Sequence, residues 1–333
     1  MNKTTLSGIK PTGVPHVGNY FGSIKPNLEK ASENNMASYL FVADYHALNQ
    51  IKDPAVLKQC VREIACTWLA CGLDPKKTVF YRQSDVPEVL ELAIILTGVT
   101  PKGLLNRAHA YKAIVQAASE DGRDPDSDVN VGLYFYPILM AADILMFDTN
   151  FVPVGQDQKQ HIEIAGDIAK AFNATYGQTL TVPEAVIKKE VAIVPGIDGR
   201  KMSKSYGNQI PLFAEAGELK KAIMRIVTDS TSPQEPKSIE HPIFQIYKLL
   251  ATDVEAKAFA KRFSSGIGWG EAKAELLRVA EREFKPLRER YNYFINNFDQ
   301  VEKILQDGAK KARVKAREVL RRVRTAIGAG ESL

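Results

Sequence analysis

Long apolar runs, a strong excess of one charge and a dense set of cysteines are all missing from this sequence of 333 residues. No stretch approaches the roughly 18 uninterrupted apolar residues of a membrane-spanning helix, and no basic leader precedes an apolar segment. We therefore expect neither a membrane span nor a signal peptide, and a cytoplasmic location. The three cysteines, Cys60, Cys66 and Cys71, have spacings that fit neither a metal knuckle nor a redox pair, so we interpret them as core or free thiols.

The charges nearly balance, with 44 basic and 39 acidic residues and a formal net charge of +5. So mild an excess does not by itself indicate a nucleic-acid partner, and the place of the charges along the chain matters more. Hydrophobic residues make up 45% of the chain, which is enough for a sizeable core and for two domains of ordinary size.

Residues 1–209 have the pattern of an α/β domain built on a Rossmann-like parallel sheet. Apolar runs of strand length alternate with amphipathic stretches of helix length, as in a parallel sheet covered by helices. Asp53 and Pro54 make a good helix start, and Gly72 a stop. The predicted strands are 5–9, 39–43, 78–82, 151–154 and 190–195. A helix is predicted over 132–147, before the fourth strand.

An insertion at about residues 100–130 interrupts this pattern and contains the acidic stretch 119–128, which we expect to be a mobile surface loop. Strand signals fade after residue 209, so we predict a second, all-helical domain over 210–333. Its final helix, 309–327, has one apolar face, and basic residues cover the rest. A solvated surface and a contact surface for a polyanion both fit this pattern.

The stretch PHVGNYFG, residues 15–22, follows the first predicted strand and opens the first helix. Its glycines and prolines allow a tight turn close to a ligand, but neither a dinucleotide-binding fingerprint nor a P-loop is present. His16 and Asn19, three residues apart, would point together as donors toward charge that grows on a phosphoryl group. A capping asparagine beside a surface histidine is the structural alternative.

A basic stretch, DGRKMSKSYGN at 198–208, follows the last predicted strand. Lys201 and Lys204 lie three residues apart among small polar residues, and flexible lysine side chains can bring positive charge to a leaving pyrophosphate when a loop closes. By itself, the stretch is equally well explained as a solvated basic loop.

Together, the H-x-G-N and K-M-S-K-S segments resemble the two signatures of class I aminoacyl-tRNA synthetases. YPILMAAD (136–143) and VPVGQDQKQHIE (152–163) are similar to the bacterial tryptophanyl members, and GIKPTG and IVTDS extend the resemblance over nearly the whole chain. The resemblance implies an enzyme that activates L-tryptophan with ATP and transfers it to tRNA(Trp). It further implies a homodimer, and Mg²⁺ that arrives with ATP, with no metal ligand from the protein.

The resemblance also points to a tryptophan pocket. Tyr136, Met140 and Asp143 share one helix face, so a single pocket can contain all three. Met140 alone is more often a core residue, whereas Asp143 in an apolar helix needs a donor, and an indole N–H is a donor only. In the resembled family, residues at the Tyr136 and Gln158 positions hold the α-amino group. The expected tryptophan-binding residues are Leu6, His46, Tyr136, Met140, Asp143, Val152, Val154 and Gln158.

For the chemical step, the resemblance implies four catalytic residues: His16, Asn19, Lys201 and Lys204. The expected ATP-binding residues are Lys10, Pro11, Thr12, Gly18, Asn19, Gly155, Gln156, Asp157, Ala192, Lys201, Met202, Ser203, Lys204 and Ser205. The expected tRNA-binding residues are Arg317, Arg321 and Arg322 on the final helix. We interpret His109 and His161 as structural.

The sequence departs from the family pattern at several positions. Lys10 stands where glutamine is common, which adds a cation near the triphosphate, and Leu6 stands where an aromatic residue often lines the indole pocket. His16 and Val17 replace a common Thr-Ile pair. A tyrosyl enzyme, a nucleotidyltransferase that does not use tRNA, and an RNA-binding protein with a degenerate catalytic domain remain alternatives.

Overall fold

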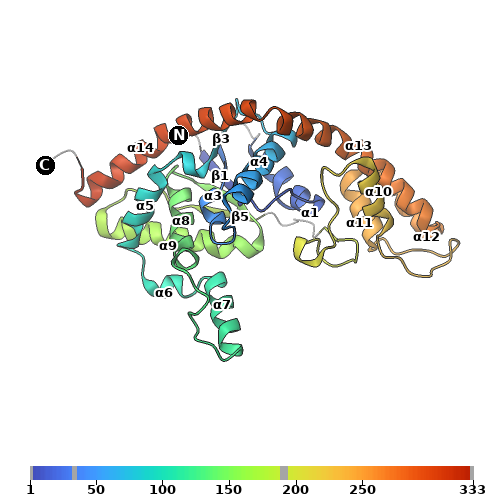
Figure 1. Cartoon of the computed structure of the whole chain (residues 1–333), viewed down its shortest axis with the longest axis horizontal. Helices are drawn as coiled ribbons and strands as arrows, with labels where there is room; N and C mark the ends of the chain where they lie inside the picture. Colours follow the sequence, from blue (N-terminus) through green and yellow to red (C-terminus); the bar gives the residue numbers. More distant parts are fainter. Residues whose placement is uncertain (1–2, 32–35, 188–193, 331–333) are drawn as a thin grey trace.

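The computed structural model describes residues 3–31, 36–187 and 194–330. A parallel sheet with its covering helices forms one body, and the helices α10 (Ala216–Met224), α11 (Pro242–Leu250) and α12 (Asp253–Ser265) lie at the opposite end of the molecule (Figure 1). The long helices α13 (Trp269–Asn296) and α14 (Phe298–Ile327) follow one another as an arc that connects the two ends (Figure 1).

The sheet has five parallel strands in the order β3-β2-β1-β4-β5. The strands are β1 (Lys3–Ile9), β2 (Met36–Val42), β3 (Thr78–Arg82), β4 (Phe151–Val154) and β5 (Glu184–Ile187). The order reverses direction between β1 and β4, and the crevice beyond the carboxyl ends of strands at such a point is where open α/β sheets bind ligands. The predicted α/β class is therefore confirmed, and the sheet itself indicates where the site lies.

Two predicted strands, β3 and β4, have the predicted bounds, whereas β1 and β2 begin two and three residues earlier than expected. The expected last strand at 190–195 falls largely outside the described residues, and β5 is the described edge strand on that side.

The helices that cover the sheet follow the local sequence signals. In α4 (Pro54–Ala70), the carboxylate of Asp53 caps the first turn by accepting the N–H groups of Ala55 and Val56. The remaining helices of this body are α1 (Val17–Asn19), α2 (Lys25–Ala31), α3 (Asp44–Ala47), α5 (Glu88–Thr97), α6 (Lys102–Leu105), α7 (His109–Glu120), α8 (Val131–Leu145) and α9 (Lys159–Tyr176). The cysteines are free thiols on and just after α4, as interpreted.

Helices α6 and α7 project from the sheet body and form most of the predicted insertion (Figure 1). The acidic stretch 119–128 begins in the last residues of α7 and continues as exposed turns. Among the described residues, no helix combines the length and apolar character needed to cross a membrane.

The final helix is longer than predicted, and it packs on the sheet body. Its apolar face, with Ala312, Ala316 and Val319, is buried in the same core cluster as Leu6 of β1 and Tyr81 of β3. The domain boundary at residue 209 stays a prediction, to which the structure adds that α14 returns to the first domain.

Two contacts fix how α14 crosses β3. Gly308 lies directly on the backbone of Phe80, where an added Cβ atom would be 1.7 Å from the carbonyl oxygen, so only glycine fits. Beside it, the guanidinium of Arg82 donates to the carboxylate of Glu302 on α14 at 2.9 Å.

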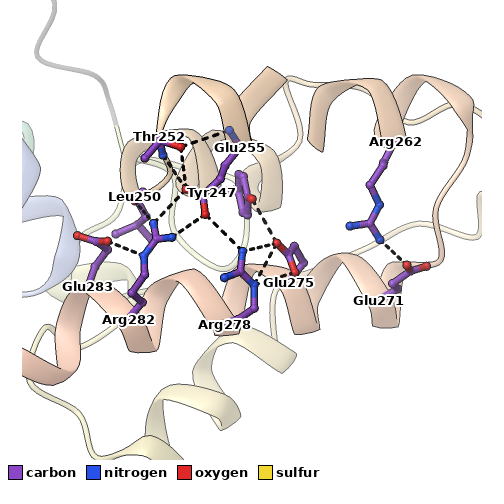
Figure 2. A network of polar contacts seen from close by, with 10 residues as sticks. All are labelled: Tyr247, Leu250, Thr252, Glu255, Arg262, Glu271, Glu275, Arg278, Arg282 and Glu283. Atoms are coloured by element: carbon purple, nitrogen blue, oxygen red, sulfur yellow. Dashed lines mark hydrogen bonds and ion pairs between the residues drawn. The ribbon is translucent and has the colours of Figure 1, made fainter. Parts of the chain in front are cut away.

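A polar network holds α11 and α12 on α13 (Figure 2). Glu255 completes a capping box with Thr252 at the start of α12 and accepts hydrogen bonds from Arg282 of α13. The hydrogen bond from Arg282 is the main reason that the pKa of Glu255 falls to about 2. Tyr247 of α11 reaches Glu275 of α13 at 3.3 Å. The three helices therefore form one unit, which we call the helical unit together with α10.

Candidate active site

The two signature segments, almost two hundred residues apart in the chain, meet in the structure. The backbone N–H of Val17 donates to the carbonyl oxygen of Ile210 at 3.0 Å, and the N–H of Gly18 contacts the sulfur of Met202 at 3.2 Å. The Nζ atom of Lys204 donates to the carbonyl oxygen of Thr12 at 2.8 Å. One face of the site is thus the early turn, and the other is the lysine-bearing loop.

His16 and Asn19 hold each other in place through a reciprocal cap. The Nδ1 atom of His16 accepts the backbone N–H of Asn19 at 3.3 Å, and the Oδ1 atom of Asn19 accepts the backbone N–H of His16 at 3.1 Å. Because Nδ1 and Oδ1 are acceptors, a neutral His16 carries its proton on Nε2, and Asn19 keeps its NH₂ group as a donor. The capping role of Asn19 and the role of both residues as phosphate donors are therefore compatible. The cap holds Nε2 of His16 and the NH₂ group of Asn19 in fixed positions as donors.

Burial is the main reason that the pKa of His16 falls to about 4, and the nearby charge of Lys204 lowers it further. The imidazole is therefore neutral at pH 7. Gly18 is required beside it, because a Cβ atom there would lie 2.9 Å from Nδ1 of His16 and 3.2 Å from Cβ of Met202.

The lysine-bearing loop is fixed by Asn208, a residue that the sequence analysis did not single out. Its buried side-chain oxygen accepts the N–H of Ser203 at 2.8 Å, and its NH₂ group donates to Asp198 at 2.7 Å and to the carbonyl oxygen of Lys201 at 3.1 Å. The side chain of Lys201 is exposed and Met202 is buried. The loop is therefore a folded segment with two cations on a fixed frame.

Asp143 is almost fully buried on α8, with 2% of its surface exposed, and has two side-chain partners. The Nε2 atom of His46 lies 2.8 Å from Oδ2, and the side-chain amide of Gln83 donates to Oδ1 and Oδ2 at 2.8 and 2.9 Å. The prediction that this carboxylate is buried and needs donors is confirmed. Gln83 was missed because nothing in its sequence neighbourhood distinguishes it.

Tyr136 and Gln158 are joined by His161, which the sequence analysis interpreted as structural. The Tyr136 hydroxyl lies 2.8 Å from Nε2 of His161, and Nδ1 of His161 lies 2.9 Å from Oε1 of Gln158. An amide oxygen accepts only, so Nδ1 donates to it, and the Nε2 atom of neutral His161 then accepts the tyrosine O–H. The three side chains therefore form one hydrogen-bonded chain with an acceptor oxygen at each end.

The other predicted site residues occupy two kinds of position. Leu6 and Val152 are buried in the sheet core, while Met140 and Val154 are partly buried against that core. Six predicted ATP-binding residues directly follow strands at the point where the strand order reverses. They are Lys10, Pro11 and Thr12 after β1, and Gly155, Gln156 and Asp157 after β4.

Burial lowers the pKa of Lys10, the cation that departs from the family pattern. The hydroxyl groups of Ser203 and Ser205 lie 2.8 Å apart within the loop. Ala192 lies outside the described residues.

The basic face of α14 is largely paired with carboxylates of the sheet body. Arg317 donates to Glu88 at 3.0 Å, and Arg322 pairs with Asp148 at 2.6 Å. Burial would raise the pKa of Asp148, but hydrogen bonds from Arg322 and Lys315 bring it below the ordinary value. Of the three arginines expected to bind tRNA, two therefore hold the helix on the catalytic core, and Arg321 is exposed.

The sequence profile of the family described as "tRNA synthetases class I (W and Y)" matches residues 2–285. A tryptophan–tRNA ligase of Neisseria meningitidis is 51% identical over 328 residues, which cover 98% of this chain and 98% of that protein. The corresponding ligase of Pseudomonas aeruginosa is 49% identical over 98% of this chain and 74% of its own length.

Among solved structures, the tryptophanyl-tRNA synthetase of Campylobacter jejuni complexed with ADP and tryptophan superposes with a TM-score of 0.88. It is 44% identical, and the match covers 98% of this chain and 99% of that chain. The profile match and these full-length identities show that the chain belongs to the W and Y family of class I tRNA synthetases.

Proposed function

We propose that this protein is a tryptophan–tRNA ligase, which forms tryptophanyl-adenylate from L-tryptophan and ATP and transfers the acyl group to tRNA(Trp). The observation that carries the proposal is the buried Asp143, held by the two donors His46 and Gln83. The relatives named tryptophan–tRNA ligases and the Campylobacter jejuni structure with ADP and tryptophan support the same substrate.

In the first step, the tryptophan carboxylate attacks the α-phosphorus of ATP and pyrophosphate leaves. The protein contributes position and charge rather than covalent chemistry. Nε2 of His16 and the NH₂ group of Asn19 would donate to the phosphate oxygens from one side, and Lys201 and Lys204 would place positive charge from the other. Mg²⁺ would arrive with the triphosphate, since it is usually held by substrate phosphates and water with few protein ligands.

In the amino-acid pocket, Asp143 would accept the indole N–H. In a pocket shaped for indole, tyrosine and phenylalanine would leave Asp143 without its partner, and a site built around such a hydrogen bond rejects a substrate that cannot make it by about 10⁴-fold or more. Tyr136 and Gln158 would accept hydrogen bonds from the α-ammonium group through the two side-chain oxygens that His161 contacts.

For tRNA, we propose that the helical unit and the exposed Arg321 supply contacts through phosphates and stacking. The ion pairs of Arg317 and Arg322 make these two arginines weaker candidates, because binding would have to share or break the pairs. We further propose a cytoplasmic homodimer, as in the resemblance. Its oligomeric state is measurable by sedimentation velocity, and a monomer at micromolar concentration would contradict it.

The deciding experiment compares ATP–pyrophosphate exchange with tryptophan and with tyrosine, followed by charging of tRNA(Trp). We expect exchange with tryptophan and aminoacylation. A preference for tyrosine in the exchange assay would identify a tyrosyl enzyme. Turnover without charging of any tRNA would favour a nucleotidyltransferase. The absence of all exchange would favour an RNA-binding protein with a degenerate catalytic domain.

A further inference from the structure

Gln83 contacts Asp143, the carboxylate that the proposed function assigns to the indole N–H, and lies in the short 3-10 helix η2 (Gln83–Asp85) that follows the carboxyl end of β3. It has no exposed surface. A fully buried amide needs hydrogen-bond partners for its donors and its acceptor. The partners of Gln83 therefore indicate its role.

The orientation of the Gln83 amide is unambiguous. Its Oε1 atom accepts the backbone N–H of Tyr45 at 3.1 Å, so the opposite atom, which faces Asp143, is the NH₂ nitrogen. That nitrogen lies 2.8 Å from Oδ1 and 2.9 Å from Oδ2 of Asp143. A donor shared by both oxygens holds the open end of the carboxylate, and the contact of His46 with Oδ2 alone sets the rotation of its plane.

The count of lone pairs then shows where a ligand fits. A carboxylate has about four acceptor sites. Oδ2 of Asp143 already accepts from His46 and Gln83, whereas Oδ1 accepts from Gln83 alone among the described residues. The remaining acceptor site therefore lies on Oδ1, and its direction is set by Gln83 and His46 together.

We infer that Gln83 is a positioning residue that determines specificity for the indole N–H, by holding Asp143 so that one lone pair of Oδ1 meets it. This inference rests on the proposed function. Gln83 does not touch the substrate, and acts only through Asp143.

The test uses the full-length protein and a pair of substrates: tryptophan, and the analogue in which sulfur replaces the indole N–H (benzothienylalanine). ATP–pyrophosphate exchange gives kcat/KM for each substrate. Gln83→Met removes the donor at similar volume, and Gln83→Leu removes it with a branched apolar side chain. Both variants are expected to lower kcat/KM for tryptophan about 10- to 100-fold, mainly through KM, with KM for ATP unchanged within about twofold.

The analogue does not use the hydrogen bond, so its kcat/KM should change by less than about threefold, and the preference for tryptophan should collapse in both variants. Thr149→Val is the matched control, since Thr149 is also fully buried and its hydroxyl has no hydrogen-bond partner among the described residues. It should leave the preference unchanged.

The outcomes separate this inference from the proposed function. If the unmodified protein shows no exchange with tryptophan, the proposed function is wrong. If it shows exchange and prefers tryptophan, but either folded variant keeps that preference or loses both substrates equally, Gln83 has a structural role only and the inference is overturned. Gln83→Leu decides the matter if Gln83→Met does not fold.

Discussion

The ammonium group of Lys204 donates to the carbonyl oxygen of Thr12 at 2.8 Å, which places a cation of the late loop directly on the turn that follows β1. This contact spans the space where the proposed mechanism places the triphosphate. A group held there by one backbone carbonyl can turn to a phosphate at little cost, because the carbonyl oxygen is exposed to water and can be solvated in its place.

Replacement of this lysine tests its part in the chemical step. Lys204→Met is expected to lower kcat for ATP–pyrophosphate exchange by about 10²-fold, because a charge aimed at the developing negative charge is lost. KM for tryptophan should stay within about twofold. The exposed Lys220 of α10 provides the control, and Lys220→Met should behave like the unmodified protein. Equal effects of the two changes would contradict the assignment.

Loss of the buried carboxylate should affect one substrate and not the other. Asp143→Ala is expected to lower kcat/KM for tryptophan by at least about 10²-fold, since Gln83 and His46 lose their acceptor and the indole N–H loses its partner. KM for ATP should change little, which steady-state exchange kinetics can measure. Intact exchange with tryptophan would remove Asp143 from the pocket.

The lowered pKa of His16 predicts a loss of stability in acid. In the unfolded chain the imidazole binds a proton near pH 6.5, whereas in the folded protein it does so only near pH 4. Its contribution is therefore complete above pH 6.5 and disappears as the pH falls to about 4, by up to about 3 kcal/mol. Urea unfolding at pH 7 and pH 5 measures this, and His16→Gln should make the decrease smaller. Parallel curves for the two proteins would refute the assignment.

The crossing of α14 over β3 depends on Gly308, which has no side chain. Gly308→Ala would put a Cβ atom 1.7 Å from the carbonyl oxygen of Phe80, so the helix must move and the free energy of unfolding should fall by about 1–3 kcal/mol or more. Gly270→Ala in the first turn of α13 meets no atom within 4 Å and should be neutral or slightly stabilising. Thermal unfolding of both variants gives the comparison, and a stable Gly308→Ala protein would show that this crossing is looser than described.

Neighbouring arginines on α14 should have different effects. Arg322→Gln breaks the pair with Asp148 and is expected to destabilise the protein by about 1 kcal/mol, seen as a lower Tm. Arg321→Gln breaks no described ion pair and should lower the rate of tRNA charging while ATP–pyrophosphate exchange is unchanged. If charging responds only to Arg322, the proposed RNA contact lies elsewhere on the helix.

The sheet could be predicted from the sequence because its signals are local. Strands such as β3 and β4 are short apolar runs between turn residues, and the residues after β1 and β4 reach the site simply because a parallel sheet collects its carboxyl ends on one edge. The helix that carries Asp143 was likewise predicted from its apolar pattern, and the isolated acid within it is buried, as expected.

What the sequence did not show is pairing across long distances. Gln83 meets Asp143, and Arg322 meets Asp148, over separations that no local pattern records. The basic face of α14 has the composition of a polyanion-binding surface, but the carboxylates that pair with it lie on α5 and in the turn after α8. Net composition cannot tell a paired cation from a free one.

The ion pair between Arg82 and Glu302 attaches the end of β3 to α14. Arg82 is the last residue of β3 and the immediate neighbour of Gln83. Its contact with Glu302 therefore joins this end of β3 to α14, which follows α13 of the helical unit (Figure 1). The end of β3 beside Gln83 is therefore connected to the helical unit through two consecutive long helices, α13 and α14.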